Sequence, residues 1–160
     1  MTLSRPHILI VEDDIDLAEC IRYNLERTSL FTSQIVESAE EAIHALFQPS
    51  SLCQDKLCKD KEKERAVQNL ALIVIDINIP GVNVVELCSR FRREDRTRLI
   101  PIIILTTHTE EAAKVKGMEV GAEYYLTKPF SIRELVARAH DVVRRTEQEV
   151  LSKSCKGHGV

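Results

Sequence analysis

The chain has 160 residues, 44% of them hydrophobic and 29% charged, which is typical of one globular domain with a buried core. Its formal net charge of −3 provides no general attraction to nucleic acid or to an anionic membrane. No apolar run approaches the roughly 20 residues of a membrane-crossing helix, and the N-terminus lacks the cleavage site of a signal peptide.

The first part of the chain contains two strand–helix units. HILIV (7–11) is a short apolar run, and a pattern of apolar residues at three- and four-residue spacing follows over 15–25. QIVES (34–38) is a weaker strand candidate. Ser38 and Glu41 then have the form of a capping box, which predicts the start of a second helix.

Residues 48–69 form a connection much longer than the median of about 4–6 residues. Its centre, 55–65, interleaves Lys and Glu, which favours an exposed insertion over a partner-binding element. Cys53 and Cys58 lack the partners of a zinc site. The five cysteines of the chain are scattered and odd in number, so we expect reduced thiols in a cytoplasmic protein.

The second part of the chain continues the alternation. LALIVID (70–76) and PIIILTT (101–107) are apolar runs rich in Ile and Leu, as expected for strands that are covered on both faces. A further strand is expected at 124–128, and helix patterns occupy 84–91 and 110–120.

A last helix is predicted after Ser131, which forms a second capping-box pattern with Glu134. Residues 147–160 are expected to be a frayed tail or a truncated linker. Five strands that alternate with five helices predict an α/β fold with a doubly wound parallel sheet.

Polar residues follow the apolar runs at the ends of four predicted strands. Glu12 and Asp13 follow the first strand, Asp76 ends the third, and Thr106 and Lys128 end the last two. In an open α/β sheet, ligands bind at the carboxyl ends of the strands. A single Asp at a strand end is most often a turn or cap residue, but four such strand ends predict one shared site.

Carboxylates that lie close together raise one another's pKa unless a cation neutralises them. Their hard oxygen atoms suit Mg²⁺, with Asp13 and Asp76 as direct ligands and Glu12 acting through water. A metal ion opposite Lys128 would favour a phosphoryl group, for which Thr106 could donate a hydrogen bond. An Asp carboxylate can accept such a group as an aspartyl phosphate.

Four motifs resemble the receiver domains of two-component response regulators: ILIVEDD (8–14), VIDINIPG (74–81), IIILTT (102–107) and GAEYYLTKPF (121–130). The resemblance implies a receiver domain over residues 6–146. It also implies a flavodoxin-like sheet with strand order 2-1-3-4-5 and five surrounding helices.

The resemblance implies a cis Lys128–Pro129 peptide bond and a role for each matching residue. These roles are the phosphoacceptor Asp76, the acidic metal-binding pair Glu12 and Asp13, a metal contact from the backbone carbonyl of Asn78, the switch hydroxyl Thr106, the rotating aromatic ring Tyr125 and the phosphate-binding Lys128. The implied function is a phosphorylation-dependent signalling switch with Mg²⁺ as cofactor. The resemblance also implies that the protein is not an enzyme beyond its own phosphoryl transfer and autodephosphorylation.

The implied partner is a sensor histidine kinase, with no direct contact to nucleic acid or membrane. The stretch KPFSIRELVARAHDVVRR (128–145) resembles receivers of the winged-helix transcription-factor class. These form homodimers through the face made by the fourth helix, the fifth strand and the fifth helix. Lys114, Glu134 and Arg138 occupy positions of interface charges in that class, but Tyr124 replaces the usual acidic partner of Arg138.

Two further residues depart from the family pattern. Thr107 stands where a small residue usually follows the switch hydroxyl, and we predict that it slows hydrolysis of the phosphoryl group. His108 is either an exposed loop residue or a residue that positions water.

Three alternative functions compete with that of a phosphorylation-dependent switch. A haloacid-dehalogenase-like phosphohydrolase would use acidic residues of 12–16, but would leave Asp76 unexplained. A degenerate receiver could act as a docking module without phosphorylation. The basic run 90–98 could contact nucleic acid, but its interspersed acids favour a solvated loop.

Overall fold

The computed structural model describes residues 5–47, 69–81, 83–107 and 121–156. The helix expected at 110–120, the residues Lys114 and His108, and the insertion up to residue 68 lie outside the described residues. The strands are β1 (His7–Val11), β2 (Thr32–Val36), β3 (Leu70–Asp76), β4 (Ile102–Thr106) and β5 (Tyr124–Thr127). In the described ranges the helices are α1 (Ile15–Glu26), α2 (Ala39–Phe47), α4 (Val84–Arg93) and α6 (Ile132–Lys156).

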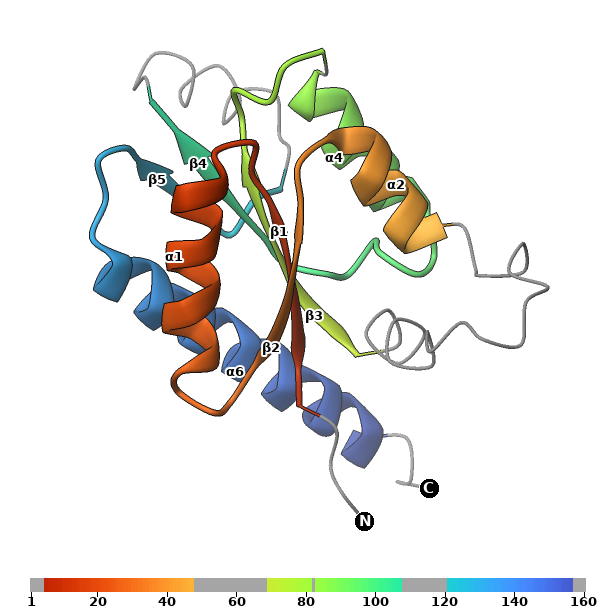
Figure 1. Ribbon diagram of the computed structural model, residues 1–160. Helices are drawn as coiled ribbons and strands as arrows, with labels where there is room; N and C mark the ends of the chain where they lie inside the picture. Colours follow the sequence, from red (N-terminus) through yellow and green to blue (C-terminus); the bar gives the residue numbers. More distant parts are fainter. Residues whose placement is uncertain (1–4, 48–68, 82, 108–120, 157–160) are drawn as a thin grey trace, which may run out of the picture.

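The five strands form one sheet in the order β2-β1-β3-β4-β5, and every neighbouring pair is parallel. This confirms the predicted doubly wound sheet and its strand order. Helices α1 and α6 cover one face of the sheet, while α2 and α4 cover the other (Figure 1). Because helices cover both of its faces, the sheet forms the middle layer of a three-layer sandwich.

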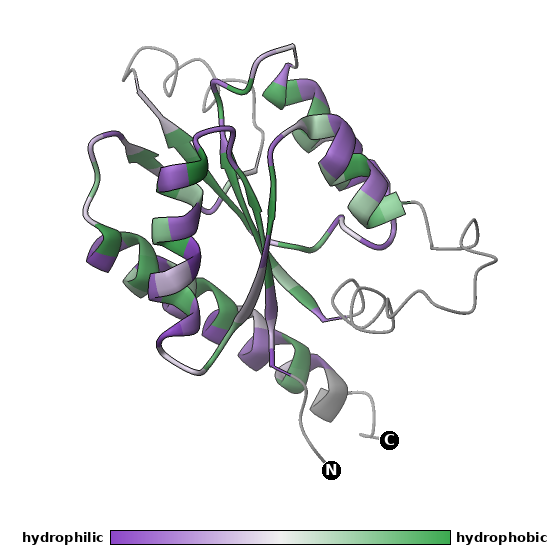
Figure 2. Cartoon of the chain, in the orientation of Figure 1, coloured by the Kyte–Doolittle hydropathy of each residue, from purple (hydrophilic) through white to green (hydrophobic). Residues whose placement is uncertain are grey.

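Successive residues of the central strands enter two separate cores. In β1, Ile8 and Ile10 pack on the side of α1 and α6, whereas Leu9 and Val11 pack on the side of α2 and α4. The alternation follows from the period of two in an extended strand. Both faces are therefore apolar, as the hydrophobic strands in the middle of Figure 2 show. The buried sheet explains why these strands appear in the sequence as unbroken apolar runs.

Side-chain caps determine where three of the helices begin. The Asp14 carboxylate accepts a hydrogen bond from the Leu17 backbone N–H at the start of α1. The Ser38 hydroxyl accepts one from Glu41 at the start of α2, as the capping-box pattern predicts. Asn83 caps α4 in the same way, although the sequence pattern did not single it out.

Helix α6 continues without a break to Lys156, so residues 147–156 are helical and not frayed, while their assignment as a tail or truncated linker stays a prediction. Neither Gly nor Pro occurs between Ile132 and Lys156, and Gly157 is the first residue that favours a helix end. No helix in the described parts of the chain is both long enough and apolar enough to span a membrane.

The strand order reverses between β1 and β3, which places a ligand-binding crevice at their carboxyl ends. Glu12 and Asp13 follow β1 directly, and Asp76 is the last residue of β3. The Lys128–Pro129 peptide bond is cis, as predicted. It follows β5 and leads into α6, so Lys128 also lies at this end of the sheet.

Candidate functional site

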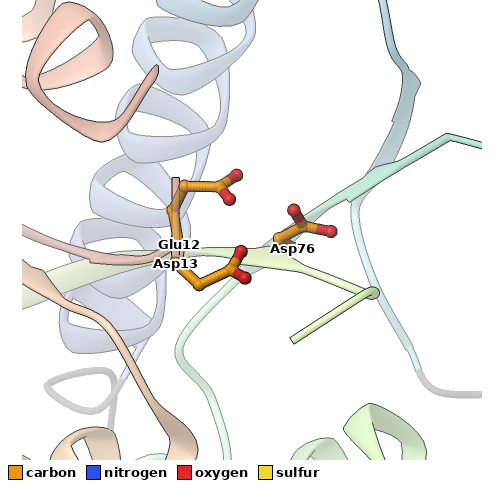
Figure 3. Close-up of side chains that lie close together, drawn as sticks. All are labelled: Glu12, Asp13 and Asp76. Atoms are coloured by element: carbon orange, nitrogen blue, oxygen red, sulfur yellow. The ribbon is translucent and has the colours of Figure 1, made fainter. Parts of the chain in front are cut away.

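Three carboxylates meet at the carboxyl end of the sheet. Glu12, Asp13 and Asp76 each contribute an oxygen atom, and these atoms all lie within 4.8 Å of one another (Figure 3). Glu12 and Asp76 are buried, with 0% and 2% of their surface exposed, whereas Asp13 is exposed to solvent. Clustered carboxylate oxygens with one solvent-facing member are a donor set that fits Mg²⁺ with retained water ligands.

Lys128 links the two buried carboxylates. Its Nζ donates to Asp76 Oδ2 at 2.6 Å and to Glu12 Oε2 at 3.1 Å. Its backbone N–H donates to the Thr106 carbonyl at 2.6 Å, which holds the residue against the end of β4. One ammonium group therefore faces three carboxylates, and this excess of negative charge favours a further cation.

The buried charges shift two pKa values at this site. Burial raises the pKa of Glu12 to about 7, and the neighbouring Asp76 adds to the rise, although the Asp14 backbone N–H and Lys128 oppose it. Burial acts to lower the pKa of Lys128, but its hydrogen bonds to Asp76 and Glu12 outweigh this effect and raise the pKa. The ammonium group therefore stays charged at neutral pH.

Backbone N–H groups orient the two buried carboxylates. The Asn78 N–H donates to Asp76 Oδ1 at 2.8 Å, and the Asp14 N–H donates to Glu12 Oε1 at 3.1 Å. Asp76 thus has one oxygen bound by the backbone and the other by Lys128. The Asn78 side chain reaches the residue that follows β4, where Nδ2 donates to Thr107 Oγ1 at 2.8 Å.

The two predicted switch residues lie beside this cluster. Thr106 is fully buried at the end of β4, one residue beyond Leu105, which pairs with Asp76 in the sheet. Tyr125 is half-buried against the core on the α2 and α4 side. Burial and the neighbouring Cys88 thiol raise the pKa of the Tyr125 hydroxyl, so it stays protonated at neutral pH.

The predicted interface residues that the structure describes lie on α6. Glu134 and Arg138 are both exposed, and the Arg138 guanidinium lies over the Tyr124 ring, 4.5 Å from its centroid. The Tyr124 hydroxyl donates to Asp141 Oδ2 at 2.9 Å and accepts from Arg145. Sequence reasoning missed this cluster. A tyrosine opposite basic residues spaced along a helix was the available signal.

The structure gives ordinary roles to residues behind two alternative functions. Asp14 is the N-cap of α1, so it is already engaged in a structural hydrogen bond. In the basic run, Arg92 donates to the backbone carbonyls of Arg98, Ile100 and Gly121. This arginine holds the loop before β4 against the turn before β5.

A family model of the response regulator receiver domain matches residues 8–140. The chain belongs to the receiver-domain family of response regulators. The matched segment includes all three carboxylates and Lys128. The structure brings these four residues together at one end of the sheet, and their roles in phosphorylation and metal binding stay predictions.

Characterised relatives of the receiver domain are transcriptional regulators. This chain is 36% identical over 147 residues to the phosphate regulon transcriptional regulatory protein PhoB of Rhizobium meliloti, and the match covers 92% of this chain and 56% of that protein. It is 39% identical over 139 residues to the PhoB protein of Pseudomonas aeruginosa, covering 87% of this chain and 52% of that protein. The chain thus spans about half the length of these relatives.

Solved receiver structures have the same fold. The receiver domain of Francisella response regulator 1452 is 26% identical and superposes with a TM-score of 0.66, covering 89% of this chain and 99% of that chain. A response regulator from Chloroflexus aurantiacus is 28% identical with a TM-score of 0.64, over 88% of this chain and 99% of that chain.

Proposed function

We propose that the protein is a phosphorylation-dependent switch in which Asp76 accepts a phosphoryl group from a sensor histidine kinase. The observation that carries this proposal is the placement of Lys128 Nζ, 2.6 Å from Asp76 Oδ2 within the carboxylate cluster. In the transfer, the phosphorus–nitrogen bond of the donor phosphohistidine breaks as a phosphorus–oxygen bond to Asp76 forms. The imidazole leaves with the bonding electron pair.

The other residues of the cluster would stabilise the charge of the phosphoryl group. Lys128 supplies an ammonium group, and the buried Thr106 hydroxyl would donate to a phosphoryl oxygen. Glu12, Asp13, Asp76 and the backbone carbonyl of Asn78 would hold Mg²⁺. When bound, the ion supplies positive charge that balances the carboxylates and the phosphoryl oxygens.

The phosphoryl group would bias a two-state element formed by Thr106 and Tyr125. A new acceptor near Asp76 draws the Thr106 hydroxyl toward it, and the space that this movement leaves permits the Tyr125 ring to turn inward. The face around β5 and the start of α6 then differs between the two states. A cytoplasmic location follows from the requirement for a kinase partner.

We also propose that the chain forms a weak homodimer through the face around β5 and α6. Arg138 already contacts the Tyr124 ring within its own chain, so pairing it with a second chain would disrupt this contact. We expect a monomer–dimer equilibrium that shifts toward dimer on phosphorylation. Sedimentation velocity with and without acetyl phosphate measures this shift, and identical profiles would contradict dimerisation.

The proposed phosphorylation is tested by intact mass after incubation with Mg²⁺ and acetyl phosphate. One added phosphoryl group is expected on the parent, and none on Asp76→Asn or in the presence of EDTA. Asp13→Asn should require more Mg²⁺ for the same yield. The matched control Asp16→Asn changes an exposed carboxylate in the first turn of α1 and should behave as the parent.

Absence of the adduct on a folded parent chain would contradict direct phosphorylation by a small donor. The same incubation with a phosphorylated histidine kinase then separates the remaining explanations. Transfer from the kinase alone would show strict dependence on a protein donor. No transfer from either donor would favour a degenerate receiver that acts as a docking module without phosphorylation.

A further inference from the structure

A groove lies at the end of the sheet opposite the carboxylate cluster. It has a volume of about 320 Å³ and is bounded by the second half of α6 and by the segments that precede β4 and β5. Pro101 comes directly before β4, and Gly121 and Glu123 come before β5. Because Asp76 lies at the carboxyl end of the sheet, the length of the strands separates it from this groove. We call it the α6 groove.

One wall of the α6 groove is a single face of α6. Its lining residues form two rows with four-residue spacing, a mainly apolar row of Val142, Thr146 and Val150 and a charged row of Arg145, Glu149 and Lys153. Residues three and four apart are neighbours on a helix surface, so the two rows run side by side. Along the helix axis, the wall is about 16 Å long. It therefore offers an apolar stripe with a charged edge over about three turns.

The opposite wall is held in place by Arg92. Its guanidinium donates to the backbone carbonyls of Arg98, Ile100 and Gly121, at 3.0, 2.7 and 2.9 Å. These three bonds tie the loop before β4 to the turn before β5, so the wall is formed before any partner binds. A preformed wall lowers the entropic cost of binding, because fewer groups must be ordered. The three acceptors are uncharged, so they do not neutralise the positive charge of Arg92.

Apolar side chains are exposed on both walls of the α6 groove. Leu99, in the loop before β4, is 74% exposed, and Val150 of α6 is 62% exposed. The buried residues Pro101 and Val142 also line the groove. Figure 2 shows hydrophobic residues as far as the last turns of α6. A single exposed apolar residue is common on a protein surface, but two that line one groove from opposite walls are typical of a docking site.

The charge of the lining favours an acidic partner. Four basic and two acidic residues give the groove a net charge of +2: Arg92, Arg98, Arg145 and Lys153 against Glu123 and Glu149. Neither Arg98 nor Lys153 forms an ion pair with another described residue. A second copy in a symmetric pair would present the same positive groove and would be repelled. A nucleic acid would meet two carboxylates and the apolar side chains, neither of which favours phosphate groups.

We propose that the α6 groove binds an acidic amphipathic helix of a partner protein. Apolar residues of that helix contact Leu99 and Val150, and its carboxylates face Arg98 and Lys153. About three turns of helix match the length of the α6 wall, and apolar residues at three- and four-residue spacing match its apolar row. The inference does not rest on phosphorylation of Asp76, and it assigns an interaction surface separate from the carboxylate cluster.

The test is an NMR titration of the full chain with a synthetic acidic peptide. The peptide has about 12 residues, is held helical by a hydrocarbon staple, and carries Leu on one face with Glu on either side. A matched peptide has Lys in place of every Glu. We expect saturable binding of the acidic peptide, with the largest amide shift changes within residues 98–101, 121–123 and 142–153. The Lys peptide should bind at least about tenfold more weakly, because its charge has the same sign as that of the groove.

Two variants separate the charged contribution from the apolar one. Arg98→Glu should weaken binding of the acidic peptide about threefold to tenfold, and added salt should remove most of this difference. Val150→Gln should weaken binding about tenfold at any salt concentration, because it removes an apolar contact. Both positions are exposed, so the fold is retained. The matched control Arg133→Glu makes the same charge change in the first turn of α6, at the other end of the helix, and should bind as the parent does.

Failure of the acidic peptide to bind, equal binding of the Lys peptide, or shift changes confined to other residues would overturn the inference. A dimer of the parent that Val150→Gln abolishes in sedimentation equilibrium would overturn it in favour of a second copy. Tighter binding of a short DNA duplex than of the acidic peptide at the same residues would overturn it in favour of a nucleic acid. None of these results bears on phosphorylation of Asp76, so the proposed function stands or fails separately.

Discussion

Two clusters of charged and polar side chains in the described part of the chain differ in burial. The carboxylate cluster places Glu12 and Asp76 out of contact with water, with one ammonium group for three carboxylates. The cluster of Tyr124, Asp141 and Arg145 lies on the surface of β5 and α6, and its donors and acceptors satisfy one another. Both contain ion pairs of similar length.

The difference shows that burial, and not the number of ion pairs, determines in which direction the pKa of a carboxyl group shifts. In the surface cluster, the Tyr124 hydroxyl bond and the charge of Arg145 lower the pKa of Asp141 in spite of slight desolvation, so each group has the charge that it has in water. In the buried cluster, burial and the neighbouring Asp76 raise the Glu12 pKa to about 7, so loss of its proton is disfavoured unless a further positive charge lies close by.

The largest expected effect is on the pH dependence of stability in the metal-free protein. Because the folded-state pKa of Glu12 is about 7 and its ordinary value is 4.5, the folded state binds more protons across that interval. Glu12 therefore makes the free energy of unfolding fall as pH rises from about 4.5 to 7, by at most about 3 kcal/mol. Urea unfolding of the parent and of Glu12→Gln in EDTA measures the difference.

The buried His7 acts in the opposite direction, because burial lowers its pKa and its contribution to stability is lost as pH falls below 6.5. Comparing variants at each pH removes this shared contribution. Glu40→Gln, an exposed carboxylate in the first turn of α2, is the matched control. Parallel pH profiles for the parent and Glu12→Gln would show that burial does not raise the pKa of Glu12. They would contradict the stated difference between the buried and the surface cluster.

A smaller effect is expected from Asp76→Asn at pH 8 in EDTA. Removing one of two adjacent buried negative charges should raise the free energy of unfolding by about 1–2 kcal/mol. Mg²⁺ at about ten times its dissociation constant should stabilise the parent by about 1.4 kcal/mol and the variant by less. Thermal unfolding with and without Mg²⁺ checks both statements. A variant less stable than the parent would show that Asp76 contributes to folding through Lys128 more than it opposes Glu12.

The smallest effect is expected in the surface cluster. Tyr124→Phe removes the hydroxyl that bonds Asp141 and Arg145 but keeps the ring under Arg138. Because these partners are exposed, water replaces the lost hydrogen bonds, and the melting temperature should stay within about 2 °C of the parent. Differential scanning calorimetry measures it. A larger drop in the melting temperature would show that the surface cluster contributes to stability as the buried cluster does.

Much of the fold was predictable because the sheet is buried on both faces. Unbroken apolar runs identified β1, β3 and β4 to within a residue at either end, and the polar residues that follow them located the site. The edge strand β2 begins at Thr32, two residues before the predicted start, because it is only partly buried and lacks a strong pattern. Strand ends at the edge of a sheet depend on pairing with a neighbour more than on local sequence.

The contacts within the site were less predictable than its location. The strand-end pattern named Glu12 and Lys128 separately but did not predict that they pair directly. The comparison with the family pattern singled out Thr107, which stands where a small residue is usual, but did not identify Asn78 as its hydrogen-bond partner. Such contacts join residues far apart in the sequence, and they depend on side-chain directions that the register of the sheet sets.

The length of α6 has a mechanical consequence. Its 25 residues form a rod of about 37 Å that starts four residues after Lys128 and passes along the sheet toward the end opposite the carboxylates (Figure 1). A tilt of about 5° at its first turn would displace Lys156 by about 3 Å, because a rigid helix of this rise converts angle into distance. A small rearrangement beside Asp76 would thus produce a larger displacement at the opposite end of the molecule.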